Sequence, residues 1–348
     1  MRIIIAMTQI PFITGGAEFL AMNLGAALKK AEHEVEFVNI PMYDNPVELL
    51  ERQILAVRLL EIEKTSAGFS DLCIGLKFPA YYIQHSNKVA WVLHQYRHAY
   101  DLWGTEYGSM QNSPEGSRIR NVVYNADNLY LQEAKQIYTI SKNVTGRMEK
   151  FNNIASTPLY HPCPDMDKFY CDRFENYILM PSRINATKRQ RLVVEAMAQT
   201  KSDIKLYVLG RPDHPSLLED LQNLIKERKL ENRVELFDFV SQEEKIKLYA
   251  NARAVMFIPY DEDYGYITLE GMSASKAVIT ATDSGGALEF IENDKTGLIV
   301  DPNSADLAKA IDMLANSASY AMELGAAAKK HISDMDITWE NVVKELTK

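Results

Sequence analysis

Two glutamates in the second half of the chain lie where a strand and a helix could bring them to a ligand. Glu262 and Glu270 are separated by seven residues in the segment PYDEDYGYITLEGMS. The apolar run Ala254 to Ile258 predicts a strand that ends just before Glu262, and Gly265 is placed to open a helix. Glu262 then stands at the exit of the strand, and Glu270 lies about two turns into the helix. A carboxylate there can accept hydrogen bonds from both hydroxyls of a ribose.

Phosphate could be held by the start of this helix and by two cations. The backbone amides of Tyr266 and Ile267 lie near the positive end of the predicted helix. In PSRINATKRQRLVVEAM, Arg183 and Lys188 flank a short loop between a predicted strand and a predicted helix. Arg contacts phosphate as a fork and Lys as a point charge, so the pair suits a diphosphate. A solvated basic cluster accounts for the same residues equally well.

A glycine pair follows the first predicted strand. Gly15 and Gly16 open directly into a helical pattern over residues 16–30. Glycines there let the backbone approach a phosphate, although such a pair is more often a tight turn. Neither G-x-G-x-x-G nor G-x-x-x-x-G-K-[ST] follows that strand, which argues against an ordinary dinucleotide dehydrogenase.

The elements that must position these residues alternate between apolar runs and helical patterns. In the first half, Arg2 to Met7 and Glu34 to Asn39 read as strands around the helix at 16–30. The second half repeats the scheme, with candidate strands at 177–180, 204–209, 234–237, 254–258, 277–281 and 297–300. We therefore expect an α/β protein with two doubly wound, Rossmann-like domains and a ligand cleft between the carboxyl ends of their sheets.

The domain boundary is expected in the proline-rich stretch TPLYHPCPDMDKF. It predicts a first domain over residues 1–165 and a second over 166–335. Residues 336–348 then form a C-terminal helix that packs back on the first domain.

Composition narrows the class of protein. The 348 residues include 38 Lys plus Arg and 47 Asp plus Glu, a net charge of −9, with 47% hydrophobic and 24% charged residues. This is an ordinary globular mixture, and its acidic balance argues against a nucleic-acid binder. Three cysteines cannot form a disulfide framework, and no run approaches the roughly 18 apolar residues of a membrane span. We expect a cytoplasmic protein, with peripheral contact at the inner membrane surface left open.

Taken together, the motifs resemble those of retaining glycosyltransferases of family 4, which have the GT-B fold. That family's pattern is a Glu-x-seven-Glu block, a paired-glycine turn, a Glu and a strand led by Thr-Gly. The ordered set here is Glu262, Glu270, Gly285-Gly286, Glu289 and Thr296-Gly297, with Gly15-Gly16 and the Arg183 and Lys188 pair in the matching earlier positions. The resemblance extends over essentially the whole chain.

The resemblance implies a role for each matched residue in the second domain. Arg183 and Lys188 would neutralise the donor diphosphate and stabilise the leaving nucleotide. Glu270 would bind the ribose, and Glu262 would hydrogen-bond sugar hydroxyls and orient the donor. Gly210, in VLGRP, matches the family's glycine after the second strand of this domain.

Other matches extend to the base and to the first domain. Phe239 and Val240 match the region that lies over the base. Gly15 and Gly16 would close on the sugar phosphate. His94 ends the strand-like VAWVLH, where the family has a histidine that binds a sugar hydroxyl or polarises the reaction centre through its backbone carbonyl. A lone histidine is more often structural, but the carboxyl end of a strand is where α/β sites form.

Some positions depart from the family pattern. Gly271 and Ser273 replace alanines after the second glutamate, and Gly271 should weaken the helix by roughly 1 kcal/mol. Asp238 replaces the glycine before the base-covering loop, which leaves the base undetermined.

The resemblance therefore implies a retaining hexosyltransferase that acts in surface polysaccharide or glycoconjugate synthesis of bacterial type. Its donor would be a UDP- or GDP-linked sugar, and its acceptor a hydroxyl of a glycan or lipid-linked molecule bound by the first domain. No metal and no cofactor are expected, because cationic side chains and helix ends would neutralise the phosphates. For the same reason, we do not interpret Asp261-Glu262-Asp263 as a metal-binding motif. A nucleotide-sugar epimerase or hydrolase on the same fold, or a non-catalytic sugar-nucleotide-binding protein, are the alternatives.

Two further segments have open interpretations. Residues 104–117 are rich in Gly, Ser, Asn and Pro, as in a functional or mobile loop, and aromatic residues around it could stack on an acceptor sugar or form a local core. The helical pattern from Val47 to Lys64 could contact an anionic membrane, but its glutamates favour a helix packed on the domain core.

Overall fold

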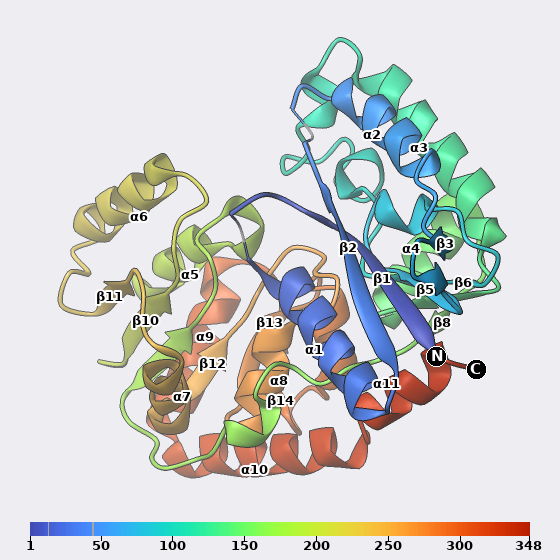
Figure 1. Ribbon diagram of the computed structural model, residues 1–348. Helices are drawn as coiled ribbons and strands as arrows, with labels where there is room; N and C mark the ends of the chain where they lie inside the picture. The colour runs from blue at the N-terminus through green and yellow to red at the C-terminus, as the bar shows by residue number, and fades with distance from the viewer. Residues whose placement is uncertain (13, 44) are drawn as a thin grey trace. The chain divides into compact units, whose positions relative to one another are not determined.

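The computed structural model describes residues 1–12, 14–43 and 45–348, and the chain divides into two compact units (Figure 1). The first unit comprises Met1–Pro164 together with Ile337–Lys348, and the second comprises Asp165–Asp336. The chain thus leaves the first unit at Pro164 and returns to it at Ile337. Both units have a parallel sheet with helices, so the α/β class expected from the sequence is confirmed.

The first unit is built on a six-stranded parallel sheet. Its strand order is β2-β1-β5-β6-β7-β8. The bounds are β1 (Arg2–Gln9), β2 (Glu34–Pro41), β5 (Leu72–Gly75), β6 (Lys88–Val92), β7 (Gln136–Thr139) and β8 (Thr157–Pro158). The interior of β1 and all of β5 and β6 are buried, as expected for parallel strands covered on both faces.

The helices of the first unit are α1 (Gly16–Lys30), α2 (Leu49–Arg58), α3 (Gly116–Tyr130), α4 (Lys142–Asn152) and α11 (Trp339–Leu346). The long helix predicted from Val47 to Lys64 is wrong beyond Arg58. There the guanidinium donates to the Tyr82 carbonyl at 2.7 Å and to Glu133 at 2.6 Å. The chain then enters a small hairpin, β3 (Lys64–Thr65) and β4 (Gly68–Phe69).

The segment 104–117 is ordered by its own hydrogen bonds. The Gln111 side-chain amide donates to the carbonyls of Thr105 at 3.1 Å and Gly108 at 2.8 Å. A short 3-10 turn, η3 (Met110–Asn112), follows before α3 begins at Gly116. Beside it, the Arg120 guanidinium lies 4.5 Å from the centre of the Trp103 ring. These contacts favour a local core over a set of aromatic rings presented to a sugar.

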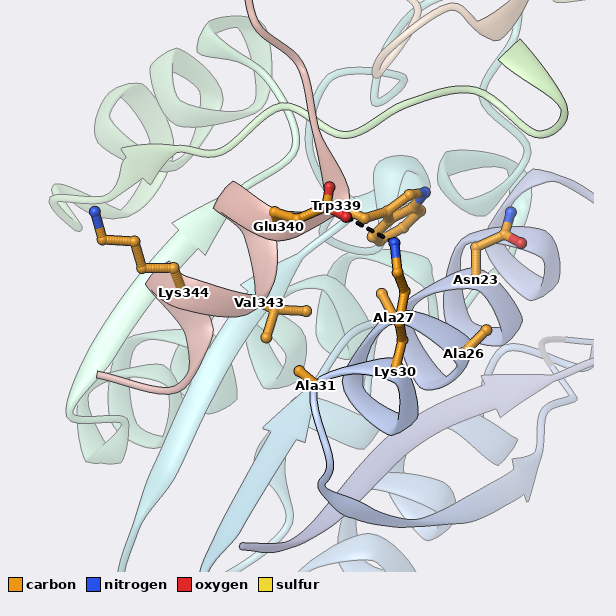
Figure 2. Close-up of a pocket in the computed structure, with 9 residues that line it drawn as sticks. All are labelled: Asn23, Ala26, Ala27, Lys30, Ala31, Trp339, Glu340, Val343 and Lys344. Atoms are coloured by element: carbon orange, nitrogen blue, oxygen red, sulfur yellow. Dashed lines mark hydrogen bonds and ion pairs between the residues drawn. The ribbon is translucent and has the colours of Figure 1, made fainter. Parts of the chain in front are cut away.

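The C-terminal helix α11 belongs to the first unit and packs beside α1. The Lys30 ammonium meets the Glu340 carboxylate at 3.0 Å, and the Trp339 ring stacks on His161 with ring centres 5.9 Å apart. Burial lowers the pKa of His161 to about 3, so this ring is neutral. Between the helices lies a largely apolar cavity of about 530 Å³, lined by small residues of α1 such as Ala27 and by Val343 of α11 (Figure 2).

The second unit repeats the architecture with strand order β11-β10-β9-β12-β13-β14, all parallel. The bounds are β9 (Tyr177–Met180), β10 (Lys205–Leu209), β11 (Val234–Phe237), β12 (Ala254–Met256), β13 (Val278–Ala281) and β14 (Gly297–Val300). The helices are α5 (Gln190–Met197), α6 (Pro215–Glu227), α7 (Gln242–Asn251), α8 (Tyr266–Ser273), α9 (Ser304–Asn316) and α10 (Ala318–Asp334). Buried side chains of all six strands and of α5, α6, α9 and α10 form one core. None of the helices in the described part of the chain has the length and apolarity to cross a bilayer.

A hydrogen-bonded cap between Ser241 and Glu244 marks the start of α7 in this unit. The Ser241 hydroxyl accepts from the Glu244 amide at 3.2 Å, and the Glu244 carboxylate accepts from the Ser241 amide at 2.9 Å. This reciprocal cap starts α7, the helix that later supplies two partners of Glu270.

A buried carboxylate organises part of the first unit. Asp127 is fully buried and accepts from the hydroxyls of Tyr81 at 3.0 Å, Tyr82 at 2.7 Å and Tyr100 at 2.6 Å. The Gln95 side-chain amide adds a fourth donor at 2.8 Å. Burial raises the pKa of Asp127, while the four hydrogen bonds oppose that rise. The carboxylate thereby joins α3 to the segments that follow β5 and β6.

Replacing Asp127 by Ala is expected to lower the free energy of unfolding by roughly 3 kcal/mol or more. The loss is large because buried hydroxyl and amide donors would be left without an acceptor. Chemical denaturation measures it, with Asn125→Ala on the exposed face of the same helix as the matched control. Equal, small losses in both variants would show that the network does not stabilise the unit.

Candidate functional site

The centre of the candidate site is the switch point of the second sheet, where the strand order reverses. β9 is the first strand of the unit; β10 and β11 extend the sheet on one side and β12 on the other. Ligands of open α/β sheets bind outside the carboxyl ends of strands at such points. Lys188 follows β9 and Glu262 follows β12, and the Lys188 ammonium donates to the Glu262 carboxylate. Two residues singled out from separate sequence motifs are therefore in direct contact.

Backbone contacts hold Glu262 in place. Its segment pairs with the Gly285 segment in a parallel bridge, and its carbonyl accepts from the Gly286 amide at 2.7 Å. A Cβ on Gly286 would lie 2.6 Å from the Asp263 carbonyl oxygen, so only glycine permits this approach. The paired glycines thus join the loop after β12 to the loop after β13.

Lys188 is positioned by its own loop. The short turn η6 (Ala186–Lys188) begins at Asn185, whose side-chain oxygen accepts from the Lys188 amide at 3.0 Å. The Lys188 ammonium lies 5.3 Å from the centre of the Phe257 ring, which suits a cation–π contact. Both its side chain and that of Glu262 are mostly buried, with 14% and 21% exposed.

Glu270 lies within α8 and is 4% exposed. One carboxylate oxygen accepts from the Lys245 ammonium at 2.6 Å, and the other accepts from the Tyr249 hydroxyl at 2.6 Å. A carboxylate has about four acceptor positions, so each oxygen can still accept another donor. Sequence reasoning missed Lys245 and Tyr249; their spacing of one helical turn on α7 was the available signal.

The helix that carries Glu270 packs closely on the sheet. Gly265, with φ of 100°, precedes α8 as its N-cap, and Tyr266 and Ile267 form the first turn. A Cβ on Gly271 would lie 3.0 Å from a methyl of Val278 and 3.2 Å from one of Val255. The glycine that departs from the family pattern therefore allows α8 to lie against β12 and β13.

Arg183 is directed to a different partner. Its guanidinium donates to Asp213 at 2.8 Å, and Asn185 donates to the other oxygen of the same carboxylate at 3.0 Å. The Arg183 side chain is 64% exposed, so it can leave this pair without a large desolvation change. The predicted pair of cations thus consists of a mostly buried lysine and an exposed arginine.

The region predicted to cover the base lies after β10 and β11. Gly210 has φ of 153°, and a Cβ there would be 2.3 Å from the Ser182 carbonyl oxygen. Phe239 is 72% exposed, with the Arg211 guanidinium 5.3 Å from its ring centre, and Val240 is half-buried. Asp238 lies 3.6 Å from the same guanidinium.

An ion pair unseen in the sequence analysis connects two of these loops. The Arg189 guanidinium donates to both oxygens of Asp283, at 2.7 Å and 2.6 Å. Arg189 follows Lys188 directly and has φ of 58°. The forked contact thus links the loop after β9 to the loop after β13 and supports the placement of Lys188.

In the first unit, Gly15 is the N-cap of α1, and Gly16 begins the helix. The Gly15 amide donates to the Glu18 carboxylate at 2.7 Å, so a negative charge of the protein already lies at this helix start. A phosphate approaching here would have to displace or avoid Glu18.

His94 lies just past β6 and is half-buried. Its Nδ1 lies 2.7 Å from the Gln95 carbonyl oxygen, which places the proton on Nδ1 in the neutral ring. Gln95 in turn donates to the buried Asp127, so the network of that carboxylate also orients the segment that carries His94. Within the described residues, no three His, Cys, Asp or Glu side chains are grouped so as to hold a metal ion.

Solved structures share the architecture over the whole chain. A sucrose-phosphate synthase from Thermosynechococcus elongatus superposes with a TM-score of 0.80 at 17% identity, covering 100% of this chain and 98% of the other. The Anabaena protein Alr3699/HepE in complex with UDP and glucose gives 0.74 at 17% identity, with the same coverage. The fold of the chain is therefore GT-B, with two Rossmann-like domains, as expected from the sequence.

Sequence comparison finds similarity to known glycosyltransferases, mainly in the second unit. Residues 170–331, within the second unit, match the family model of glycosyl transferases group 1. The alpha-1,3/1,6-mannosyltransferase ALG2 of Dictyostelium discoideum is 33% identical over 37% of this chain and 30% of its own length. A Campylobacter jejuni N-acetylgalactosaminyltransferase is 31% identical over 36% of this chain and 33% of its own length. The chain thus spans about a third of the length of these two curated relatives.

The Tyr249 hydroxyl, which donates to Glu270, should contribute more to the free energy of unfolding than a tyrosine hydroxyl that donates to a neutral group. Tyr249→Phe is expected to lower the free energy of unfolding by about 1.5–3 kcal/mol, since the acceptor is a buried charged group. The matched control is Tyr177→Phe, whose hydroxyl donates to the Leu248 carbonyl at 2.7 Å and should lose about 0.5–1.5 kcal/mol. Urea denaturation followed by circular dichroism compares them. Equal losses would contradict a charged Glu270 held by α7.

Proposed function

We propose that the protein is a retaining glycosyltransferase that moves a sugar from a nucleoside diphosphate sugar to a hydroxyl acceptor. The observation that carries this proposal is the contact of Lys188 with Glu262 at the carboxyl edge of the second sheet, with Glu270 in the helix α8 that follows Glu262 in the chain. Lys188 follows β9, Glu262 follows β12 and Glu270 lies within α8. A cation and two carboxylates suit a ligand with both phosphates and hydroxyls.

The donor would lie across the switch point. Lys188, the first-turn amides of Tyr266 and Ile267, and Arg183 once it leaves Asp213 would bind the diphosphate. Glu270 would accept from the ribose hydroxyls while Lys245 and Tyr249 keep its carboxylate in place. The base would lie toward Gly210, Phe239 and Val240, where an exposed aromatic ring is available for stacking.

The transfer reaction would occur where the donor sugar contacts Glu262. In a front-face substitution, the bond from the anomeric carbon to the diphosphate oxygen breaks, and the acceptor oxygen bonds to the same face of that carbon. The acceptor proton passes to the departing phosphate. Lys188 would stabilise the negative charge that develops on the diphosphate, and Glu262 would hold sugar hydroxyls. No protein nucleophile is assigned.

The first unit would bind the acceptor and complete the donor site through Gly15, Gly16 and His94. With Nδ1 of His94 donating to the Gln95 carbonyl, Nε2 is the ring atom that would accept from a sugar hydroxyl. Glu18 at the start of α1 makes this unit a weaker place for a phosphate than the second unit.

The comparisons support a nucleotide-sugar donor and a lipid-linked acceptor. Alr3699/HepE has been solved with UDP and with UDP-glucose, and the Campylobacter relative is named for a diphospho-undecaprenol-linked sugar. We therefore propose a UDP- or GDP-linked sugar as donor and a glycan or lipid-linked acceptor, in surface polysaccharide or glycoconjugate synthesis. We also propose that the protein is cytoplasmic and contacts the membrane peripherally through its first unit.

The first step of the test is to find the donor. Thermal-shift measurements against UDP-, GDP-, ADP- and TDP-sugars should reveal one nucleotide that raises the melting temperature, because a ligand bound only to the native state stabilises it. The donor found in this way is then used in transfer assays with glycan and lipid-linked acceptors.

Lys188→Ala and Glu270→Ala are each expected to lower kcat/KM for transfer by about 100- to 1,000-fold, as for loss of one transition-state or positioning contact. Lys309→Ala, at an exposed lysine of α9, is the control and should keep full activity. Transfer at the wild-type rate by both site variants would refute the assignment. Donor consumption without an acceptor would instead indicate a hydrolase or epimerase, and donor binding without turnover a sugar-nucleotide-binding protein.

A further inference from the structure

A cysteine and a buried lysine lie in contact away from the proposed donor contacts. Lys276 follows α8 and is fully buried, and its ammonium nitrogen lies 3.3 Å from the Cys171 sulfur. Cys171 is exposed, in the segment that leads from the first unit into β9. Both residues belong to the second unit.

The lysine nitrogen is held toward the sulfur from several sides. It donates to the Arg173 carbonyl oxygen and lies 3.7 Å from the centre of the Phe174 ring. Its own backbone amide donates to the Gly271 carbonyl at 2.9 Å. Burial lowers the pKa of Lys276, which increases the share of neutral amine with a nucleophilic lone pair.

The thiol has access to solvent that the other cysteines lack. Cys73 and Cys163 are 0% and 2% exposed. Oxidation of cysteine to sulfenic acid follows thiolate character and exposure. A small oxidant dissolved in water therefore reaches Cys171 first, and the Lys276 nitrogen lies 3.3 Å from its sulfur.

We infer that Cys171 and Lys276 form a redox-modification site in which a peroxide leads to a reversible covalent S–N bond. First, the sulfur attacks the peroxide, the O–O bond breaks, and one water leaves; the thiol has lost two electrons and is a sulfenic acid. The Lys276 nitrogen then attacks the sulfur, the S–O bond breaks, and a second water leaves with a proton of the amine. The product is a sulfenamide, and a thiol reductant restores both side chains.

The bond would tie the interdomain segment to the helix of the candidate site. In that segment, the turn η5 (Met166–Lys168) packs on α8, and the Phe169 ring lies 5.2 Å from that of Tyr249, which donates to Glu270. A covalent link from Cys171 to Lys276, three residues past the end of α8, would hold this segment against the helix. The inference stands on the side-chain contact and does not depend on sugar transfer.

Peptide mass spectrometry of the full-length protein tests the inference. The protein is treated with hydrogen peroxide, unfolded, alkylated and digested with trypsin without reductant. A modified Lys276 resists trypsin, so residues 169–173 should appear joined to residues 254–295, at the sum of the two masses less two hydrogens. Dithiothreitol should release the two peptides, and the melting temperature of the oxidised protein should be higher than that of the reduced protein.

Three variants separate this reaction from others. Cys171→Ser and Lys276→Arg should abolish the joined peptide, and an unchanged melting temperature shows that each variant folds. Cys163→Ser should keep it, because that buried thiol takes no part. Normal cleavage after Lys276, with Cys171 converted to sulfinic acid or to a disulfide between two molecules, would overturn the inference.

Discussion

The contact between Lys188 and Glu262 across the switch point of the second sheet is the interaction on which the candidate site depends. Parallel strands that share a carboxyl edge bring the loops after β9, β12 and β13 to one place, whatever their distance in sequence. Lys188 and Glu262 neutralise each other there, Arg189 and Asp283 form a second pair beside them, and Gly286 lets the last two loops meet at backbone distance. A cation that is mostly buried remains stable because its partner carboxylate is present, and it lies where a diphosphate would gain most from it.

Both units place a carboxylate in their interior and surround it with donors. Glu270 is held by Lys245 and Tyr249, and Asp127 by three tyrosine hydroxyls and the Gln95 amide. Buried carboxylates cost free energy unless they are hydrogen-bonded, so each requires a rigid set of neighbours. In the second unit that rigidity orients a proposed ribose contact. In the first, it orients the segment after β6, where His94 lies.

Much of this could be predicted from sequence because it depends on local pattern. The Gly16–Lys30 helix was predicted with its observed bounds, since apolar spacing and flanking residues mark both ends. The strand predicted over Ala254 to Ile258 is observed as Ala254–Met256, although the Phe257 amide still donates to the Ile279 carbonyl. The helix from Val47 to Lys64 was wrong beyond Arg58 because tertiary contacts of Arg58 with Tyr82 and Glu133 lie outside any local window.

The side-chain partners of the site could not be predicted in the same way. Arg183 and Lys188 are five residues apart, yet one meets Asp213 and the other Glu262. The packing of loops from distant strands determines which carboxylate each side chain meets. Gly271 is another case that local pattern does not predict. A glycine lowers the stability of an isolated helix, but here it allows α8 to approach Val255 and Val278.

The most direct test of the account is a crystal structure of the protein with its nucleoside diphosphate sugar bound. The account predicts the diphosphate against Lys188 and the first turn of α8, and the ribose hydroxyls within hydrogen-bond distance of Glu270. A nucleotide bound elsewhere, with Lys188, Glu262 and Glu270 making only their contacts to one another, would contradict it.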